Sequence, residues 1–455
     1  MRRVVFLMLF LSMTWAMAVP GLGTPVLECG QTKPPEPGGP MAEQGQQHCA
    51  MAQMPGMKAQ SSAMIATILR HEDAGTSLEP GSTPVPMLMT TAGKWQLMFH
   101  GEAFINEEQQ SGPRGADKLF STNWFMPMAQ RQLGPGELTV RTMMSLEPAT
   151  VTERRYPELF QEGETAYGRP IVDGQHPHDL FMELAAFYDV KLNEHTLVSF
   201  YGGAVGDPAM GPTAFPHRAS ASEDPLAPLG HHLEDSTHIA DDVITAGLAY
   251  RAVRVEASGF HGREPDEYRW NIDSGAIDSW STRVTVSPAQ NWSMQYSIAH
   301  LTSPEAIRPG GDTRRMTASV MYNRRLGRGN WATTLLWGRN SDLNEHQVFN
   351  GYLAESTVHF LNRNNVWERV ENVDRTSDLL PGAAVALNAP EGFLARVQAY
   401  TTGYDREFSW VPGVSTALGG QVTFYSKPAF LTPLYGAHPA GVVVFVRFRP
   451  EGHMH

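Results

Sequence analysis

The sequence predicts an all-β protein, a transmembrane antiparallel up-and-down β-barrel of about 16 strands. Three observations predict this fold. Strand-like runs have about the length that a tilted strand needs to cross a bilayer. The connections between the runs alternate between long and short, and polar side chains alternate with apolar ones along the runs. A soluble sandwich would not be expected to keep such an alternation of loop lengths over sixteen strands.

The first 18 residues have the pattern of a cleaved secretory signal peptide. Arg2 and Arg3 precede an apolar run, and Ala16 and Ala18 form an A-x-A cleavage site. The apolar run is short for a spanning helix, so an uncleaved membrane anchor is the weaker alternative. We therefore expect an exported chain that is located in the cell outer membrane.

Residues 19–93 are rich in Pro, Gly, Gln and Met and lack periodicity, which predicts a disordered periplasmic leader. One short helix is expected near residues 62–72. The leader also holds side chains with soft sulfur and imidazole ligands that suit Cu(I), although they could equally belong to a tail without a role. This expected leader site consists of His48, Cys49, Met51, Met54 and Met57.

The two cysteines, Cys29 and Cys49, both lie in the leader. They could form one disulfide in an oxidising compartment. The predicted barrel does not depend on cysteine.

Residues 94–450 carry the strand pattern, and residues 451–455 form a tail. Most of the sixteen runs are close to the 9–11 residues of a tilted membrane strand. The runs are 95–106, 119–131, 136–147, 180–191, 195–206, 242–251, 252–262, 279–287, 291–301, 314–324, 329–339, 346–360, 365–373, 391–405, 414–427 and 439–449.

Every long connection follows an odd-numbered strand, so all long loops should lie at one end of the barrel. One brief connection, residues 340–345, interrupts the pattern. The long connections are 107–118, 148–179, 207–241, 263–278, 302–313, 374–390 and 428–438.

The faces of the strands also alternate. Arg254 and Glu256 share one face of a predicted strand, while Val253 and Val255 share the other. Polar residues inside and apolar residues outside indicate a transmembrane barrel, since a soluble barrel would invert this pattern. The residues predicted to line the pore are Arg254, Glu256, Arg283, Glu355, His359, Arg369, Glu371, Arg396 and Arg447.

This mixture of charges fits a wet pore with a transverse field, and it also fits a closed interior held by salt bridges. A barrel of sixteen strands leaves an aqueous channel unless loops fill it. The long loop at residues 207–241 and the N-terminal segment are the candidates to fill it.

Histidines and acids concentrate in the stretch GHHLEDSTHIADD at residues 230–242. Two related stretches, QHPHD at 175–179 and FHGREPDE at 260–267, lie in neighbouring long loops. Imidazole and carboxylate ligands fit zinc, nickel, iron or Cu(II). A polar loop network folded over the mouth would use the same residue types and stays open as an alternative. The expected rim metal site consists of His176, His178, Asp179, His231, His232, Asp235, His238 and His261.

No catalytic or cofactor-binding residue is predicted, because the H-E-x-x-H, C-x-x-C and G-x-S-x-G motifs are absent from the sequence. The net charge is −12 and the pI is about 5.8. Without a basic stripe, nucleic acid is excluded as an expected partner.

Four motifs, QHPHDLFMELA, LGHHLEDSTHIADDVITAGLAYR, FHGREPDE and YGAHP, resemble a family of uncharacterised, porin-like outer-membrane β-barrel proteins of Gram-negative bacteria. The resemblance covers nearly the whole mature chain and implies the fold and the location only. The leader is also similar in composition to the outer-membrane copper-resistance protein B family, a likeness confined to residues 48–57.

We consider one expected function and two alternatives. The first is a porin-like channel or passive transport barrel, without enzymatic activity, that contacts outer-membrane lipid and passes small solutes or ions, with a homo-oligomer as an open option. The second is a metal-handling protein that binds copper or zinc, related to copper resistance or efflux. The third is a lipid or glycan hydrolase, which is supported only by the presence of Ser236 and Ser258 near histidines.

Overall fold

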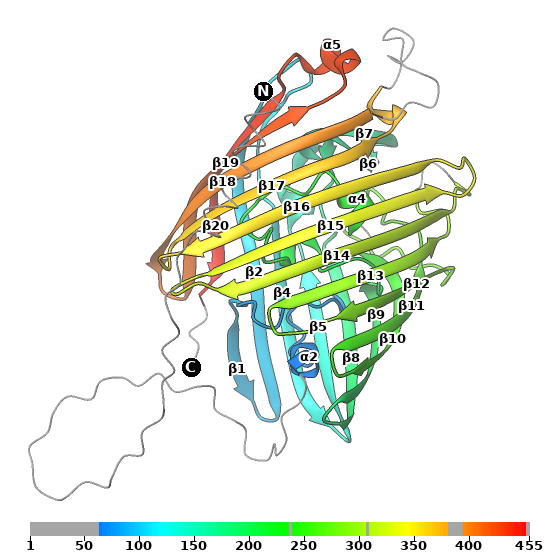
Figure 1. The fold of residues 1–455 in the computed structure, drawn as a ribbon, viewed down its shortest axis with the longest axis vertical. Coiled ribbons are helices and arrows are strands. Elements are labelled where there is room, and N and C mark those ends of the chain that lie inside the picture. Colours follow the sequence, from blue (N-terminus) through cyan, green and yellow to red (C-terminus); the bar gives the residue numbers. More distant parts are fainter. Residues whose placement is uncertain (1–62, 236–238, 306–308, 381–394, 452–455) are drawn as a thin grey trace, which may run out of the picture. The chain divides into compact units, whose positions relative to one another are not determined.

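The computed structural model describes residues 63–235, 239–305, 309–380 and 395–451. Sixteen antiparallel strands close into a barrel, and this confirms the predicted fold class (Figure 1). Neighbouring strands in the sequence pair with each other around the sheet, as expected of an up-and-down barrel.

Each predicted run coincides with a barrel strand, and the ends differ by only a few residues. The strands are β2 (Trp95–Gln110), β4 (Asn123–Leu133), β5 (Gly136–Met144), β8 (Phe181–Asn193), β9 (Thr196–Gly206), β10 (Ala240–Tyr250), β11 (Val253–His261), β12 (Ser279–Val286), β13 (Trp292–Leu301), β14 (Thr313–Arg325), β15 (Asn330–Asp342), β16 (Val348–Phe360), β17 (Asn364–Arg375), β18 (Ala395–Val411), β19 (Val414–Ser426) and β20 (Ala440–Pro450).

The barrel closes where the first strand meets the last. The second half of β2 pairs with β20, from Ala103 opposite Phe448 to Gln110 opposite Gly441. The first residues of β2 pair instead with β1 (Leu88–Ala92). β3 (Asp117–Phe120) pairs with the end of β2 and leads directly into β4.

The remaining elements are short and lie mostly in the long connections. None of the helices in the described part of the chain is long and apolar enough to cross a membrane. The remaining elements are α2 (Ala63–Ile68), α3 (Glu147–Thr150), η1 (Thr152–Arg154), the hairpin of β6 (Tyr156–Ala166) and β7 (Arg169–Gln175), η2 (Phe215–His217), α4 (His231–Glu234), η4 (Ser377–Leu379), η5 (Ala429–Leu431) and α5 (Thr432–Tyr435).

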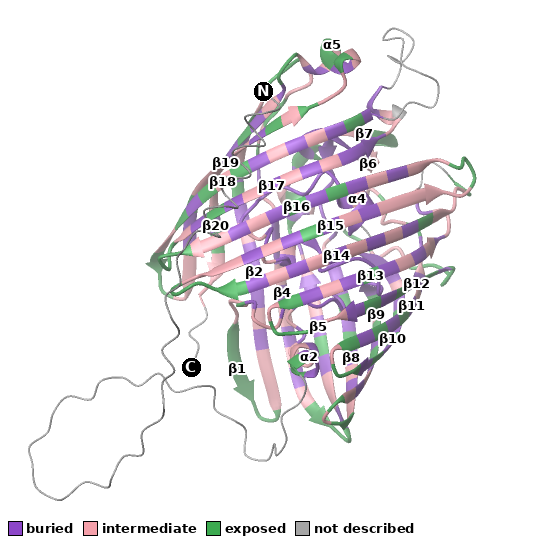
Figure 2. Cartoon of the chain, viewed as in Figure 1, coloured by how far each residue is buried: buried purple, intermediate pink, exposed green. Residues whose placement is uncertain are grey.

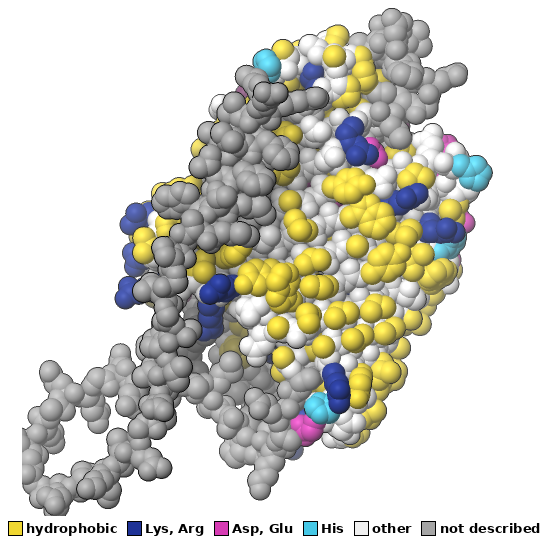
Figure 3. Space-filling view, viewed as in Figure 1, with side chains coloured by type: hydrophobic (Ala, Val, Ile, Leu, Met, Phe, Trp, Pro, Cys, Tyr) yellow, Lys and Arg dark blue, Asp and Glu magenta, His cyan; other side chains and the backbone are white. Residues whose placement is uncertain are grey.

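The outer wall is apolar. In β11, Arg254 and Glu256 are buried inside while Val253 and Val255 are exposed outside. Figure 2 shows the same alternation along the other strands, and Figure 3 shows hydrophobic side chains gathered over the outer wall. This surface is the kind that faces lipid.

Two segments fill the lumen. From the end with the long loops, called the mouth here, residues 207–235 fold inward; we call them the plug loop. From the end with the short turns, residues 63–83 enter; we call them the N-terminal plug.

The N-terminal plug corrects part of the predicted disordered leader. The predicted helix is present as α2, and its apolar side chains Met64, Ile65 and Ile68 pack against Leu197 and Ala249 of the inner wall. Residues 63–83 are ordered because this burial offsets the entropy of fixing them. The signal peptide, both cysteines, the leader site His48–Met57, Ser236, His238 and the end of the tail lie outside the described residues.

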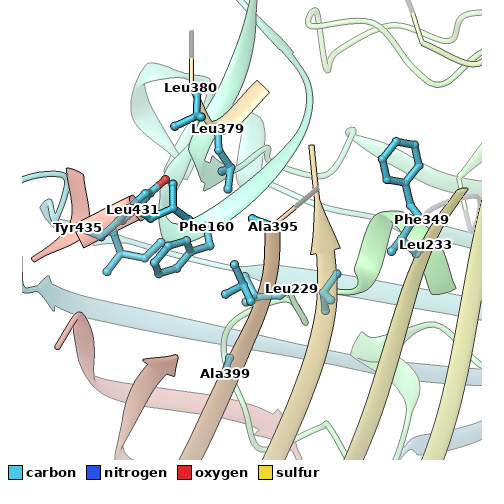
Figure 4. Packing of buried hydrophobic residues seen from close by; sticks show 13 residues of the cluster. Phe160, Leu229, Leu233, Phe349, Leu379, Leu380, Ala395, Ala399, Leu431 and Tyr435 are labelled. Carbon is cyan, nitrogen blue, oxygen red and sulfur yellow. The ribbon is translucent and has the colours of Figure 1, made fainter. Parts of the chain in front are cut away.

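The prediction that Arg396 lines the pore is wrong. Arg396 is on the outer face of β18, next to Asp374, whereas its neighbours Val397 and Ala399 point inward. Next to Val397 and Ala399, an apolar cluster of loop and wall residues, including Phe160 and Leu229, occupies the interior (Figure 4). The rule of polar residues inside therefore fails where the plug loop presents a hydrophobic surface.

Candidate functional site

The charged residues of the inner wall are almost completely buried. The exposed fraction is 2 % for Arg283, 1 % for Glu256, 2 % for Glu355 and 0 % for Arg447. In an open barrel of sixteen strands such side chains would face a water-filled channel. The lumen is therefore filled at the level of these residues.

Arg141 of β5 holds the N-terminal plug. Its Nη1 donates to the carbonyl oxygens of His71 at 2.9 Å and Asp73 at 2.6 Å, and its Nη2 donates to that of Gly75 at 2.8 Å. The guanidinium also forms a buried ion pair with Glu183 of β8. One wall residue thus binds the backbone carbonyl groups of three alternate plug residues.

Ion pairs fix the plug loop to other strands of the wall. Arg218 of the loop donates to Glu355 of β16 at 2.5 Å. Arg369 of β17 lies 3.0 Å from Asp224 of the loop. Arg447 of β20 pairs with Glu223 of the loop. Since these charges are buried, each pair is sensitive to removal of one partner.

The two plugs meet in the lumen. Arg283 of β12 donates to the carbonyl oxygen of Gly211 in the plug loop at 3.1 Å and to Oγ1 of Thr76 in the N-terminal plug at 2.8 Å. Gly75 has a φ of +53°, and a Cβ built on it would lie 2.3 Å from the Cβ of Asp207. Only glycine fits this contact between the plugs.

Most residues predicted to line the pore face inward and contact the plugs or each other. Arg396 is the exception already described, and His359 is half-buried near the turn end. The buried inward-facing members are Arg254, Glu256, Arg283, Glu355, Arg369, Glu371 and Arg447.

A histidine cluster lies in the loop layer at the mouth. His176 follows β7, and His231 and His232 are the first residues of α4. The ring centroids are 5.3 Å apart for His176 and His232, and 5.0 Å apart for His231 and His232. One nitrogen from each of the three rings lies within 4.8 Å of the other two. The structure thus brings together three residues of the predicted rim site.

A carboxylate adjoins the cluster. Oε1 of Glu164, on β6, is 2.9 Å from Nε2 of His176. Burial would raise the pKa of Glu164, but Arg269 and His176 hold it well below its ordinary value. Arg269 pairs with Glu164 and also with Asp179, at 3.2 Å. Glu164 is therefore an anion beside the imidazoles.

Burial lowers the pKa of His176, and it lowers that of His232 well below the ordinary value. Both imidazoles are therefore neutral at neutral pH. Glu164 and Glu264 each place a carboxylate oxygen within 4.8 Å of a His232 nitrogen. Burial raises the pKa of Glu264 to about 8.

The cluster is linked to the barrel wall through hydrogen bonds. Nδ1 of His231 is 2.6 Å from Oδ1 of Asp235. Nη1 of Arg218 donates to Oδ2 of the same Asp235 at 3.1 Å, and Arg218 in turn binds Glu355. His231 is thus positioned by a chain of contacts that ends on β16.

Other residues of the predicted rim site lie outside the cluster. Nδ1 of His178 is 3.0 Å from Oε2 of Glu147, which outweighs burial and raises the pKa of His178. His261 donates to the carbonyl oxygen of Ala276 at 2.9 Å and faces the next loop. Asp179 pairs with Arg269, and Asp235 supports His231 without belonging to the three-histidine group.

The sequence interpretation did not assign Glu164 to the site, and it included Glu264 only within the stretch FHGREPDE. Glu164 reaches His176 because the β6–β7 hairpin folds back on itself. The acidic stretch QEGE at 161–164, in the middle of the second long loop, is the signal that could have pointed to it.

Together, the closed sheet, the apolar outer wall and the filled lumen define a membrane β-barrel with an internal plug. No family model matches the sequence, and no curated protein matches it.

The chain is similar to several solved outer-membrane barrels. The anion-selective porin from Comamonas acidovorans is 11 % identical with a TM-score of 0.49, over 78 % of this chain and 99 % of that one. Pseudomonas putida OprB is 8 % identical with a TM-score of 0.49, over 78 % and 94 %. Salmonella typhi OmpF is 10 % identical with a TM-score of 0.46, over 80 % and 100 %. The fold assignment rests on the strand pairing of this chain itself.

Proposed function

We propose that this chain is an outer-membrane, porin-like barrel for passive transport of small solutes or ions, and that transport requires displacement of the plug loop. The observation that carries the proposal is the contact between the plug loop and the charged inner wall. Beneath the plug loop, the wall is lined by polar side chains and by charged side chains of both signs, as an aqueous channel would be.

Displacement of the plug loop would expose both signs of charge. Glu355 and Asp405 contribute carboxylates, while Arg369 and Arg447 contribute guanidinium groups, and all four project from the wall strands. Such a lining carries a transverse field that favours small polar or charged solutes over apolar ones. Outer-membrane lipid on the outer wall is the second partner that the proposal implies, and a homo-oligomer stays a prediction.

The direct test compares single-channel conductance in planar bilayers for the full chain and for a variant in which residues 212–229 are replaced by a short Gly/Ser linker. We expect rare steps from the full chain and large, persistent steps from the variant. Heat-modifiable gel mobility establishes that both barrels are folded. Absence of conductance from a folded variant would refute displacement of the plug loop as the step that opens the barrel.

The metal-handling function is the second candidate, and the convergence of His176, His231 and His232 favours it. The hydrolase has less support. Oγ of Ser258 accepts a hydrogen bond from the backbone N–H of Ala209 at 2.7 Å and is 2.7 Å from Oγ1 of Thr245. This serine holds the plug loop to the wall, and no histidine is among these partners.

A further inference from the structure

We propose that His176, His231, His232 and Glu164 bind one divalent transition-metal ion of the zinc, nickel or copper type, and that this ion locks the plug loop to the β6–β7 hairpin. The metal site stands on its own geometry. Its effect on opening of the barrel rests on the proposed transport function.

The four side chains come from two separate long loops. Glu164 and His176 belong to the connection that contains the β6–β7 hairpin, whereas His231 and His232 belong to the end of the plug loop. An ion bound by all four would join these loops by coordinate bonds. Loops that are otherwise held by side-chain contacts would then be cross-linked above the lumen.

The spacing suits one ion after a small closure. The three histidine nitrogens lie within 4.8 Å of one another. Ligand atoms about 2.0–2.1 Å from a tetrahedral ion are about 3.4 Å apart, so the nitrogens need to approach one another by at most about 1.4 Å (4.8 − 3.4). Rotation of side chains on α4 and after β7 can supply such a movement.

The arrangement of hydrogen bonds presents lone pairs to the centre of the cluster. Nδ1 of His176 is 3.0 Å from the carbonyl oxygen of Pro177, which requires a proton on Nδ1 and leaves Nε2 as the ligand atom. Asp235 is placed on Nδ1 of His231 in the same manner. Outer-shell acceptors of this kind orient metal-binding histidines.

Two buried Nε2 atoms lie in the cluster. Nε2 of His176 is 2.9 Å from Oε1 of Glu164, and Nε2 of His232 has no hydrogen bond among the described residues. A cation beside these atoms would be bound by both imidazole nitrogens and by the Glu164 carboxylate.

The ligand set determines the class of ion. Three imidazoles and one carboxylate suit zinc, nickel or Cu(II), whereas calcium and magnesium prefer oxygen ligands. The imidazoles must be neutral to bind the ion, so zinc affinity falls as pH is lowered.

Calorimetric titration of the folded full chain in detergent with zinc tests the site. We expect the double variant His231→Ala/His232→Ala to lose one zinc equivalent. His261→Ala, at the same mouth but facing Asp278, should retain it. A His48→Ala/Cys49→Ala variant identifies any zinc bound by the leader. Unchanged zinc stoichiometry and affinity in the double variant would overturn the site.

A further variant tests the site even if the double variant does not fold. Gly163 lies so close to His232 that an added Cβ would be 2.9 Å from its ring atoms. Gly163→Ala keeps every ligand but displaces the His232 ring, and we expect zinc affinity to fall at least tenfold. Wild-type affinity in this variant, together with a double variant that does not fold, would also contradict the site.

Conductance with and without zinc then separates the lock from the transport function. If the ion locks the plug loop, zinc should reduce the frequency of opening severalfold and a chelator should restore it. Zinc binding without any conductance would refute the channel but keep the site. Conductance that is unchanged when zinc is bound would show that the ion does not lock the plug loop.

Discussion

Arg218 of the plug loop and Glu355 of the barrel wall form a buried ion pair, with Nε 2.5 Å from Oε1. Neither side chain is exposed, and Glu355 also receives a hydrogen bond from Arg369 at 3.2 Å. Removing one partner from such a pair costs about 3–5 kcal/mol, because the other charge is left buried. The pair is therefore a main attachment of the plug loop.

Arg218→Met is expected to loosen the plug loop without unfolding the barrel. Asp235 and Glu355 lose a shared cation, so water must enter to solvate them. Single-channel recording should show an opening probability raised by tenfold or more. Arg396→Met is the matched control, because Arg396 is on the outer face of β18. Equal opening in the two variants would contradict this role of Arg218.

Gly75→Ala should separate the two plugs. Alanine at a φ of +53° costs about 1–2 kcal/mol, and its Cβ would also collide with Asp207. Gly93→Ala is matched in backbone, with a φ of +63°, but has no atom within 4 Å of its Cβ. Hydrogen exchange of residues 63–83 should be faster in the first variant only. Similar exchange in both would mean that the collision is relieved at no cost.

Arg141→Gln should release the N-terminal plug. Three plug carbonyls lose their donor, at about 1–3 kcal/mol for each group left unsatisfied. Cleavage by trypsin after Arg70 should become much faster. Arg251→Gln, in an exposed turn at the same end, serves as the control. Arg70 that stays resistant in the folded Arg141 variant would exclude this anchoring.

Alkaline pH should weaken the N-terminal plug. Burial raises the pKa of Glu72 from 4.5 to about 7 and that of Asp73 from 3.8 to about 6. The seated plug therefore prefers protonated carboxyls. This contribution is full below the pKa values of the released segment and is lost as pH rises through about 7.

Hydrogen exchange of residues 63–83, corrected for its intrinsic pH dependence, measures this effect. Protection should fall 10- to 100-fold between pH 5 and pH 8, since two pKa units correspond to about 2.7 kcal/mol. Glu72→Gln should reduce the dependence. The same corrected protection at both pH values would refute the role of these carboxyls.

The strands were predictable because their signals are local. Alternation along a strand, as in Val253 and Arg254, and the order of short and long connections do not depend on distant contacts. Arg396 was placed on the wrong face because the inner side of β18 is decided by the plug loop, which presents Leu229 there. Local periodicity cannot report a partner that arrives from another part of the chain.

The candidate site was predictable in part for the same reason. His231 and His232 are adjacent in the sequence, and His176 lies in a related stretch. Glu164 and Arg269 join them only through the folding of two further loops. The N-terminal segment was named as a candidate to fill the lumen, but the order of residues 73–83 was not predicted. These residues are polar and rich in small residues, and they are buried through hydrogen bonds to wall arginines rather than through an apolar face.

The seam between β2 and β20 has a consequence for assembly. It brings Ala103 opposite Phe448, which are 345 positions apart (448 − 103), whereas the other barrel strands pair with close neighbours in the sequence. Contacts of such long range form late, because a large loop entropy must be overcome first. The segment before β1 should therefore be taken up while the sheet is still open. Closure of the seam would then enclose it, and no threading through a finished barrel is needed.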